Sequence, residues 1–375
     1  MNKPLAPPFR RFLVTGGAGF IGTSFCHMLL EQPTTERLVI LDALTYAGNR
    51  ANLAHCLADP RTLFVHDDIR NLDLVSRLLR QEDITCLVHC AAESHVDRSI
   101  ADPMLFVANN VLGTQSLLEA ARTAWRTATG PRRFHHISTD EVFGSLAPDA
   151  KPVTEQAPYE PRSPYSASKA AADHLVMAYH HTFGMPVTLS YAANNYGPYQ
   201  YPEKLIPFFL INALHGRALP IYGDGLQQRD WMHVHDHCRG ILAVLAAGQV
   251  GCSYNLPGTG ERTNLAIARQ ITTILDRRMA ADATLRQRYP ACPAAAGASC
   301  ATLLTHISDR PGHDRRYAMD GSLAAAQLGF RAAIPFEQGL EQTIDWYLEH
   351  AGWWQDILER HGPSRQPWLK NATAR

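Results

Sequence analysis

The chain has 375 residues, which exceeds a typical single domain and leaves room for two modules with an ample core. Its 35 basic residues balance its 35 acidic residues, so no net field attracts a polyanion. With 46% hydrophobic and 19% charged residues, the composition is that of a globular protein rather than a disordered or fibrous one. We therefore expect a packed protein with a small-molecule ligand, no nucleic-acid partner and no membrane partner.

The eight cysteines are scattered, without a CxxC pair or a Cys/His pair at zinc spacing. This pattern predicts buried thiols in a reducing compartment and no metal site. The start of the chain, MNKPLAPPFRR, lacks the apolar run of a signal peptide, and no stretch approaches the ~20 apolar residues that cross a bilayer. These features favour a cytoplasmic protein.

From residue 10 onward, short β-branched or Leu-rich runs alternate with longer helical stretches, as in a parallel sheet with crossover helices. The expected strands are 12–15, 38–41, 62–66, 86–90, 134–138 and 186–190. Each interval leaves room for one crossover helix, so both faces of the sheet should be covered. The pattern predicts an α/β fold of the Rossmann type, a doubly wound parallel sheet whose site lies at the strand carboxyl ends.

After residue 195 the composition changes: the sequence becomes rich in proline and aromatic residues, with short strand-like runs separated by turns. This change indicates a smaller α/β C-terminal lobe that binds substrate. The apolar run 240–247 and the strand-like 252–256 could return to the first lobe. We therefore expect a first domain at 1–195 with a return segment near 232–256, and a second lobe at 196–231 and 257–350. Residues 279–301 form an Ala/Pro/Cys-rich insertion without periodicity, and 351–375 form a C-terminal tail.

The segment LVTGGAGFIG places Gly16, Gly19 and Gly22 between an apolar strand and a helical stretch. Glycine lets the backbone turn tightly and approach a pyrophosphate, which the helix N-terminus stabilises through its free N–H groups. Asp42 closes the second strand twenty residues after Gly22, where a carboxylate can accept from both ribose hydroxyls of an adenosine. Because this carboxylate repels a 2′-phosphate, the pattern favours NAD over NADP.

Residues that follow two further strands are placed where they could contact a bound dinucleotide. Asp68 and Ile69 follow the third strand and would frame the adenine, although a strand-end Asp is as often a solvated carboxylate. Ala91 and Ala92 follow the fourth strand and would let the chain pass close to the nicotinamide half.

The segment YSASK places Tyr165 and Lys169 on one face of a helix, about one turn apart. A lysine ammonium beside a phenol favours the phenolate and lowers a tyrosine pKa that is ~10 when unperturbed, which makes the tyrosine a usable base. An isolated YxxxK is more often an amphipathic helix with a snorkelling lysine. Because this YxxxK follows a dinucleotide-binding motif in the chain, we predict that Tyr165 and Lys169 are catalytic.

The triplet Thr139, Asp140 and Glu141 directly follows the strand FHHIS. Adjacent carboxylates at a strand end repel each other and lose solvation, which is unfavourable for stability. Repulsion and burial can leave one carboxyl protonated and the other ionised, so the pair suits chemistry that removes one proton and delivers another at neighbouring atoms. The alternative is a solvated turn with a hydroxyl cap.

Taken together, these segments resemble the dTDP-glucose 4,6-dehydratase family of the extended short-chain dehydrogenase/reductase superfamily, and the resemblance covers roughly residues 10–350. It rests on TGGAGFIG, LDALTYAGN, AAESHVDRSI, STDEVFG, SPYSASK, NNYGPYQYPEKLIP, PIYGDG, QRDW and DRPGHDRRYA. The Thr-Asp-Glu triplet separates this family from the related sugar-nucleotide epimerases.

The resemblance implies a hydro-lyase in which Tyr165, assisted by Lys169, takes the proton of the sugar 4-hydroxyl while a hydride passes from carbon 4 to NAD. Thr139 would hydrogen-bond the oxygen at carbon 4. Glu141 would remove the carbon 5 proton as protonated Asp140 donates to the departing 6-hydroxyl. The hydride would then return to carbon 6, so NAD is regenerated in each cycle and tightly held.

The resemblance also carries over contact residues. Beyond the residues named above, the cofactor contacts are Phe20, Ile21, Leu44, Thr45, Ser94, Asn109, Ser138 and Asn195. The substrate contacts, together with Thr139, are His95, Asn194, Lys204, Leu205, Pro220, Tyr222, Arg229, Asn264, Arg310 and His313. Arginine suits a diphosphate clamp because it forms bidentate contacts. A solvated basic turn remains an alternative for Arg315 and Arg316, and a core histidine for His95.

Three positions depart from the family pattern. Phe143 stands in place of a tyrosine and Asn109 in place of a threonine. Tyr191, Ala192 and Ala193 replace residues that are usually Asn or Arg followed by Cys and Ser, and they lie beside Asn194. We therefore expect nucleotide or sugar preference to depend on this segment, and the 279–301 insertion to reshape the substrate mouth.

The open alternatives are a dehydratase of a UDP-linked or amino sugar, an epimerase or decarboxylase on the same scaffold, and an NAD-binding protein without catalysis. The carboxylate pair argues against an epimerase or decarboxylase, and the intact Tyr165 and Lys169 argue against a mere binder. The resemblance further implies a homodimer with a four-helix interface, to which 103–122 and 166–181 could contribute.

Overall fold

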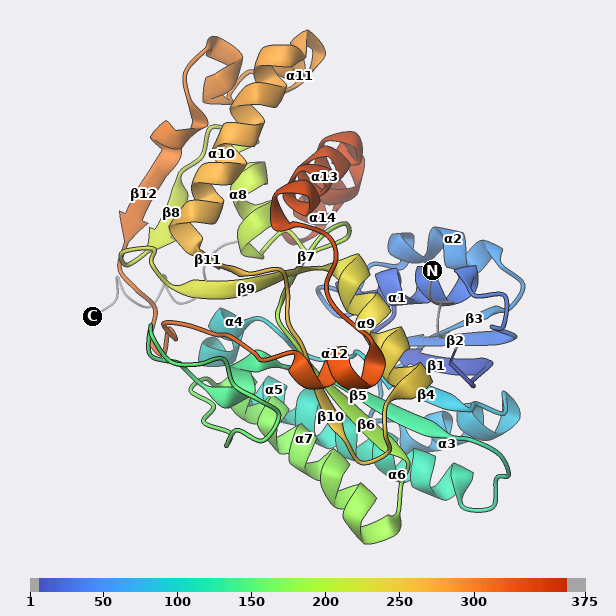
Figure 1. Ribbon diagram of the computed structural model, residues 1–375. Helices are drawn as coiled ribbons and strands as arrows, with labels where there is room; N and C mark the ends of the chain where they lie inside the picture. The colour runs from blue at the N-terminus through green and yellow to red at the C-terminus, as the bar shows by residue number, and fades with distance from the viewer. Residues whose placement is uncertain (1–6, 363–375) are drawn as a thin grey trace.

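A computed structural model describes residues 7–362 of the chain (Figure 1). The larger lobe is built on a seven-stranded sheet in the order β10-β6-β5-β4-β1-β2-β3, in which every neighbouring pair is parallel. Its strands are β1 (Arg11–Thr15), β2 (Arg37–Asp42), β3 (Thr62–His66), β4 (Cys86–His89), β5 (Arg133–Thr139), β6 (Val187–Ala192) and β10 (Ser253–Leu256). The predicted α/β fold with a parallel Rossmann-type sheet is confirmed.

Both faces of this sheet are covered, because successive side chains of a strand point to opposite sides. Phe12 and Val14 of β1 pack in a core with α1 (Phe20–Glu31) and α9 (Val234–Ala247). Leu13, between them, packs in a second core with α3 (Leu72–Gln81), α6 (Gly113–Trp125) and α7 (Pro164–Phe183). Strands buried on both faces require near-continuous apolar runs, which explains the pattern in the sequence.

Short helices also lie in the connections between the strands of the large sheet. They are η1 (Arg50–Leu53), α2 (Ala54–Ala58), α4 (Val96–Ala101), α5 (Pro103–Phe106), the π-helix η2 (Val107–Leu112) and η3 (Asp140–Phe143). The capping box of α7, in which Ser163 and Ser166 bond each other's backbone N–H, fixes where that helix begins. Tyr165 and Lys169 therefore lie in its first two turns.

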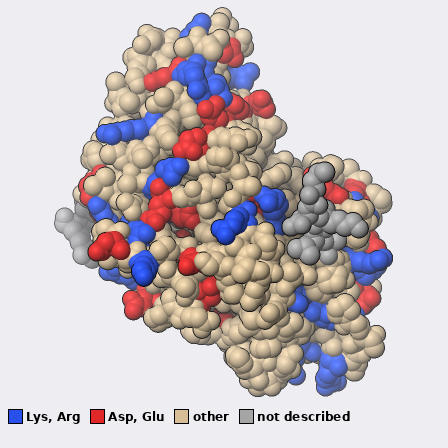
Figure 2. All heavy atoms as spheres, in the orientation of Figure 1, with Lys and Arg blue, Asp and Glu red and all other residues tan. Residues whose placement is uncertain are grey.

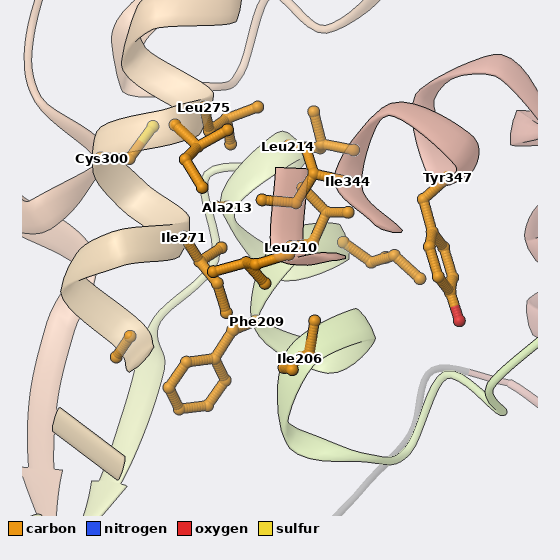
Figure 3. Packing of buried hydrophobic residues seen from close by; sticks show 14 of the residues in the cluster. Ile206, Phe209, Leu210, Ala213, Leu214, Ile271, Leu275, Cys300, Ile344 and Tyr347 are labelled. Atoms are coloured by element: carbon orange, nitrogen blue, oxygen red, sulfur yellow. The ribbon is translucent and has the colours of Figure 1, made fainter. Parts of the chain in front are cut away.

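The smaller lobe has its own sheets and core. A three-stranded sheet joins β11 (Glu261–Thr263), β9 (Gln228–His233) and β7 (Asn194–Tyr196), and a two-stranded sheet joins β12 (Leu304–Ile307) and β8 (Leu219–Tyr222). Side chains of α8 (Leu205–Leu214), α10 (Asn264–Ala281) and α13 (Phe336–Glu349) form the core; Phe209, Ile271 and Ile344 belong to it (Figure 3). Between these elements, α9 and β10 bring the chain back to the large sheet, where α12 (Ser322–Leu328) packs against them.

Two segments contain secondary structure that the sequence did not predict. The 279–301 insertion contains α11 (Ala283–Arg288), η4 (Pro293–Ala296) and the start of η5 (Cys300–Leu303), and it buries Tyr289 in the core of the smaller lobe. It therefore packs the lobe, and none of its residues lines a site cavity. The predicted tail begins with a helix, α14 (Ala351–His361), because Trp354 is fully buried and donates to the Tyr347 carbonyl at 2.9 Å. Residues 363–375 lie outside the described residues.

The surface carries both signs of charge. Basic and acidic side chains are interspersed over the face seen in Figure 2, in keeping with the net charge of zero. Among the helices described between residues 7 and 362, none combines the length and the apolar character that a bilayer crossing requires.

Candidate active site

Two neighbouring cavities, of about 320 and about 210 Å³, open at the carboxyl edge of the large sheet and extend toward the smaller lobe. The first is lined by the glycine-rich turn, the ends of the strands and the start of α7. The second is lined by α4, α8, β8, β9 and the loop that carries Arg310. The residues that line both are Ser94, Glu141, Asn194, Asn195, Gln200, Glu203 and Lys204. The two cavities therefore adjoin at Glu141.

The structure brings the predicted site residues together, with one exception. Predicted cofactor residues that line the first cavity are Gly16, Gly19, Phe20, Ile21, Gly22, Asp42, Thr45, Asp68, Ile69, Ala91, Ala92, Ser94, Asn109, Ser138, Tyr165, Lys169 and Asn195. Predicted substrate residues that line the second are His95, Asn194, Lys204, Leu205, Pro220, Tyr222, Arg229, Asn264, Arg310 and His313. Thr139, Asp140 and Glu141 line the first cavity.

Close backbone approach explains the glycines of the turn after β1. Gly16 has φ +69, and a Cβ atom there would lie 2.6 Å from the Cα of Ala91. A Cβ on Gly22 would lie 2.1 Å from the Gly16 carbonyl oxygen. The turn leads directly into α1, whose first residues line the cavity, and the first N–H groups of a helix lack intrahelical partners. The turn therefore offers a site for a phosphate group.

Asp42 closes β2 at the wall of the same cavity. Its Oδ2 accepts from the Ala18 N–H at 2.9 Å and its Oδ1 from the Leu44 N–H at 2.8 Å. Burial raises the pKa of Asp42, while these two hydrogen bonds oppose the rise. Leu44 does not line the cavity: its N–H donates to Asp42, and its side chain packs against the α1 core, so its role as a cofactor contact stays a prediction.

Asp140 and Glu141 follow β5 at the junction of the two cavities, and their side chains have different electrostatic surroundings. Burial and the neighbouring Glu141 raise the pKa of Asp140 well above its usual value, and its Oδ2 has no hydrogen-bond partner among residues 7–362. Burial also raises the pKa of Glu141, but the cations Arg310, Arg229 and Lys204 oppose that rise. The surroundings therefore favour the protonated form more strongly at Asp140 than at Glu141, where three cations favour the anion.

Tyr165 and Lys169 line the first cavity from α7, as the YSASK spacing predicts. The pKa of Tyr165 is nevertheless raised, by burial and by Glu141, while a hydrogen bond with Thr139 opposes the rise. The predicted direction is wrong because the Lys169 ammonium turns elsewhere: its Nζ donates to the Ile137 carbonyl at 2.8 Å and lies 3.2 Å from His136 Nε2. Burial lowers the pKa of Lys169 to about 8.

The second cavity is lined with cationic and polar side chains. Arg310 Nη1 pairs with Asp97 Oδ1 at 2.7 Å, and the Tyr222 hydroxyl donates to the other oxygen of Asp97 at 3.0 Å. Lys204 Nζ donates to the Ser94 carbonyl at 2.8 Å. The guanidinium of Arg229 lies over the Tyr317 ring, 4.1 Å from its centroid. Three cations around one cavity suit an anionic ligand such as a diphosphate.

The structure shows the contacts of the three residues for which a structural alternative was open. Arg315 pairs with Asp224 at 2.9 Å and Arg316 with Glu261 at 2.5 Å, and neither lines a cavity, so both are structural. His95 lines the second cavity and caps α4 through its Nδ1. Burial and Lys204 lower its pKa to about 3, so its imidazole is neutral.

Sequence reasoning missed several residues of the site. Tyr46 and Glu203 line the first cavity and are joined by a 2.7 Å hydrogen bond. Asn110 bridges Glu93 and Ser168 with bonds of 2.8 to 3.0 Å, which ties η2 to α7. Asp97 lies within the AAESHVDRSI motif, which is a signal that could have identified it, whereas Tyr46 and Glu203 meet only through the tertiary fold.

The first cavity fits a dinucleotide. Gly16 and Gly22 have no space for a side chain, because a Cβ atom would collide with Ala91 or with the turn itself. With glycine at both positions, the backbone of the turn is free to approach a phosphate group. A carboxylate stands at the end of β2, and the small residues Ala91 and Ala92 also line the cavity. The second cavity, lined by Arg229 and Arg310, adjoins the reactive carboxylates rather than the glycine turn. These features place a cofactor site and an anionic substrate site on either side of Glu141.

Known proteins are similar over nearly the whole chain. The family model described as GDP-mannose 4,6 dehydratase matches residues 13–343. A dTDP-glucose 4,6-dehydratase of Xanthomonas campestris pv. campestris is 48% identical over 353 residues, covering 93% of this chain and 96% of the relative. The crystal structure of the dTDP-glucose 4,6-dehydratase DesIV of Streptomyces venezuelae, with NAD and the ligand TYD bound, is 46% identical. It covers 92% of this chain and 99% of DesIV, with a TM-score of 0.82.

A second solved structure, the dTDP-glucose 4,6-dehydratase of Bacillus anthracis in complex with NAD, is 39% identical with a TM-score of 0.80, over 93% of this chain and 99% of that one. The fold, the Thr-Asp-Glu triplet beside Tyr165 and Lys169, and these matches agree. The chain belongs to the dTDP-glucose 4,6-dehydratase family of the extended short-chain dehydrogenase/reductase superfamily.

Proposed function

We propose that this protein is a hydro-lyase that converts dTDP-glucose to dTDP-4-keto-6-deoxyglucose, with NAD as a cofactor that is restored in each cycle. The observation that carries the proposal is the placement of Asp140 and Glu141, two carboxyls with different surroundings, in one cavity with Tyr165 and Lys169. A simple dehydrogenase or epimerase needs only the tyrosine base, whereas removal of water needs an additional acid and base.

The first step in this mechanism is oxidation at carbon 4. Tyr165 takes the proton of the 4-hydroxyl, and the hydroxyl of Thr139 holds the same oxygen in place. NAD, when bound in the first cavity, would accept the hydride from carbon 4 and return it later to carbon 6. Burial and Glu141 disfavour the Tyr165 phenolate, and the charge of Lys169, four residues away in the same cavity, would offset part of that effect.

The second step is loss of water across carbons 5 and 6. The new ketone acidifies carbon 5, so Glu141 removes that proton while protonated Asp140 delivers one to the leaving 6-hydroxyl. Glu141 returns its proton to carbon 5 as the hydride reaches carbon 6. Tyr165 still holds the proton of the 4-hydroxyl, and Asp140 lacks one. Thr139 bonds Tyr165 and lies 3.3 Å from Asp140 Oδ1, so its hydroxyl can carry that proton across.

The substrate would span the second cavity. We propose that Arg229, Arg310 and Lys204 hold the diphosphate, and that Pro220 and Tyr222 flank the base. We also propose that residues 1–195 with the return segment 232–256 bind NAD, and that 196–231 with 257–350 bind the sugar nucleotide. We infer a cytoplasmic place of action, because NAD and nucleotide sugars are metabolites of that compartment and all eight cysteines are free thiols.

The test is incubation of the purified protein with dTDP-glucose, UDP-glucose and UDP-N-acetylglucosamine in separate samples, with mass spectrometry of each nucleotide sugar. We expect loss of one water from dTDP-glucose. Loss of water from only one of the other nucleotide sugars would support the dehydratase reaction but assign it a different substrate. Loss from none of them, with NAD bound, would overturn the proposal in favour of a non-catalytic binder.

We further propose that the protein acts as a homodimer through α5, η2, α6 and α7. Met104, Val107 and Leu112 on this face expose 71%, 43% and 58% of their surface, which is unusual for large apolar side chains that lie so close together in the chain. Exposed positions along α7 include Ala167, His174 and Ala178, and the two alanines allow a close helix approach. Leu112→Glu should shift the protein from dimer to monomer in sedimentation, and a wild-type monomer would overturn the proposal.

A further inference from the structure

The proposed reaction gives no role to the buried carboxylate that lies beside Lys169 on α7. Asp173 lies on α7, one turn after Lys169, and is 1% exposed. Its Oδ2 accepts from the Ser138 hydroxyl at 2.6 Å and from the Tyr159 hydroxyl at 3.2 Å. Its Oδ1 lies 3.2 Å from Nε2 of His136. Burying a carboxylate behind a catalytic lysine is costly unless it has partners, so its presence calls for an explanation.

The hydroxyl groups around Asp173 form a directed chain. The Tyr159 and Tyr191 hydroxyl oxygens are 2.5 Å apart, and Tyr191 also bonds Ser253. Tyrosine has a single hydroxyl proton. Because Tyr159 donates its proton to Asp173, Tyr191 must donate to Tyr159, and Ser253 to Tyr191. Every donor points toward Asp173, which stabilises an ionised carboxylate rather than a carboxylic acid.

This arrangement changes the expected role of Tyr191. The sequence associates Tyr191 with substrate preference, but its side chain lines neither cavity and lies in the core with Phe143 and Tyr254. Its ring packs edge-on against Phe143, with centroids 4.9 Å apart. Ala192 and Ala193 do line the first cavity. Tyr191 therefore acts behind the site, on the hydroxyl chain that ends at Asp173.

Asp173 is also the counter-charge of Lys169: it follows Lys169 by one helical turn, and His136 Nε2 lies 3.2 Å from both Lys169 Nζ and Asp173 Oδ1. The groups that face Lys169 are His89 at the end of β4, Cys90 directly after it, His136 on β5 and Asp173 on its own helix. Burial lowers the pKa of His89 and His136 well below the usual value and raises that of Cys90 to about 12, so all three are uncharged at neutral pH. Burial raises the pKa of Asp173 only to about 6, so Asp173 is the anion of this group.

We propose that Asp173 is a positioning residue for the oxidation step: held ionised by Ser138, Tyr159 and Tyr191, it keeps the buried Lys169 protonated and fixes the Ser138 hydroxyl at the wall of the cofactor cavity. This role rests on the proposed function, because it acts through Lys169. The charge relation itself can be measured without any substrate.

The chain has only five lysines, at positions 3, 151, 169, 204 and 370, so the protein labelled with carbon-13 at lysine Cε gives a spectrum simple enough to assign with Lys169→Arg. The wild-type Lys169 signal should titrate near pH 8. In Asp173→Asn, which keeps the shape but removes the charge, the midpoint should fall by about one pH unit or more. Tyr191→Phe should shift it in the same direction by less, because Asp173 keeps two of its donors, and this variant answers the question if Asp173→Asn does not fold.

Asp236→Asn is the matched control. Asp236 is also fully buried, and it accepts from the N–H groups of Ala333 and Ile334 at 2.7 Å, but it lines neither cavity. Asp236→Asn should leave the pH midpoint of the Lys169 titration unchanged, even if it lowers the stability of the protein. An unchanged midpoint in Asp173→Asn, or an equal shift in Asp236→Asn, would overturn the proposal.

A second readout connects the charge to catalysis. The alkaline limb of kcat/KM with dTDP-glucose should move to lower pH in Asp173→Asn by the same amount as the Lys169 midpoint, since kcat/KM reports ionisations of the free enzyme. If wild-type protein converts dTDP-glucose and the midpoint does not move, the role of Asp173 fails and the function stands. If the midpoint moves and no sugar nucleotide is converted, the proposed function fails instead.

Discussion

Glu141→Gln is the substitution that separates oxidation from water loss most clearly. It removes the carboxylate that three cations, Arg310, Arg229 and Lys204, favour as an anion, while the size of the side chain is kept. General base catalysis typically contributes about 100- to 10,000-fold, so water loss should slow by that factor, or about 3–5 kcal/mol in the barrier. Glu141 also raises the pKa of Asp140, so its loss leaves Asp140 less protonated and weakens the acid as well.

The assay follows two signals after dTDP-glucose is mixed with NAD-loaded protein. Near-ultraviolet absorbance reports reduction of the nicotinamide, and mass spectrometry reports water loss from the sugar. We expect reduction to persist while water loss nearly stops. Glu160→Gln, an exposed carboxylate that follows the same strand, is the control and should behave as wild type. Water loss at the wild-type rate in Glu141→Gln would refute the assignment of the base.

Three further predictions concern the cofactor, the pH dependence and the fold. Asp42→Ala should weaken NAD binding by at least about tenfold in calorimetry, because a hydrogen bond to a charged group contributes ~1.5–3 kcal/mol, and unchanged affinity would place the ribose elsewhere. Wild-type kcat/KM should fall as the pH rises through about 8, where the buried Lys169 loses its proton; a profile that stays flat well above that pH would contradict the assigned charge. Trp354→Ala should lower the free energy of unfolding by about 3–5 kcal/mol in urea, since a fully buried indole is lost, and a change below measurement error would mean that α14 does not stabilise the lobe.

The sequence predicts most of this site because its chemistry is concentrated at strand ends. The carboxyl ends of parallel strands meet at one edge of a sheet, so motifs after β1, β2, β4 and β5 must converge once the sheet is recognised. The position of Leu44 outside the cavity lining arises from local backbone conformation. Its φ of +49 turns the side chain toward the core, and periodicity carries no information about such a turn.

The direction of the Tyr165 pKa shift could not be read from the spacing of YSASK. Spacing places Lys169 on the same helix face, but the partner of its ammonium is chosen by β5, which offers the Ile137 carbonyl and His136. The hydroxyl chain that runs from Ser253 to Asp173 joins four separate segments of the polypeptide, so no local sequence pattern predicts it. Burial and long-range hydrogen bonds, which depend on the whole fold, decide both features.

Transfer of the hydrogen from carbon 4 to carbon 6 within one active site tests the account most directly. The protein with NAD bound is given dTDP-glucose that carries deuterium at carbon 4, and the product is analysed by NMR. The account predicts that the deuterium is found in the carbon 6 methyl group of dTDP-4-keto-6-deoxyglucose. Release of the deuterium to the solvent, or a product without it at carbon 6, would contradict the proposed cycle of oxidation, water loss and return.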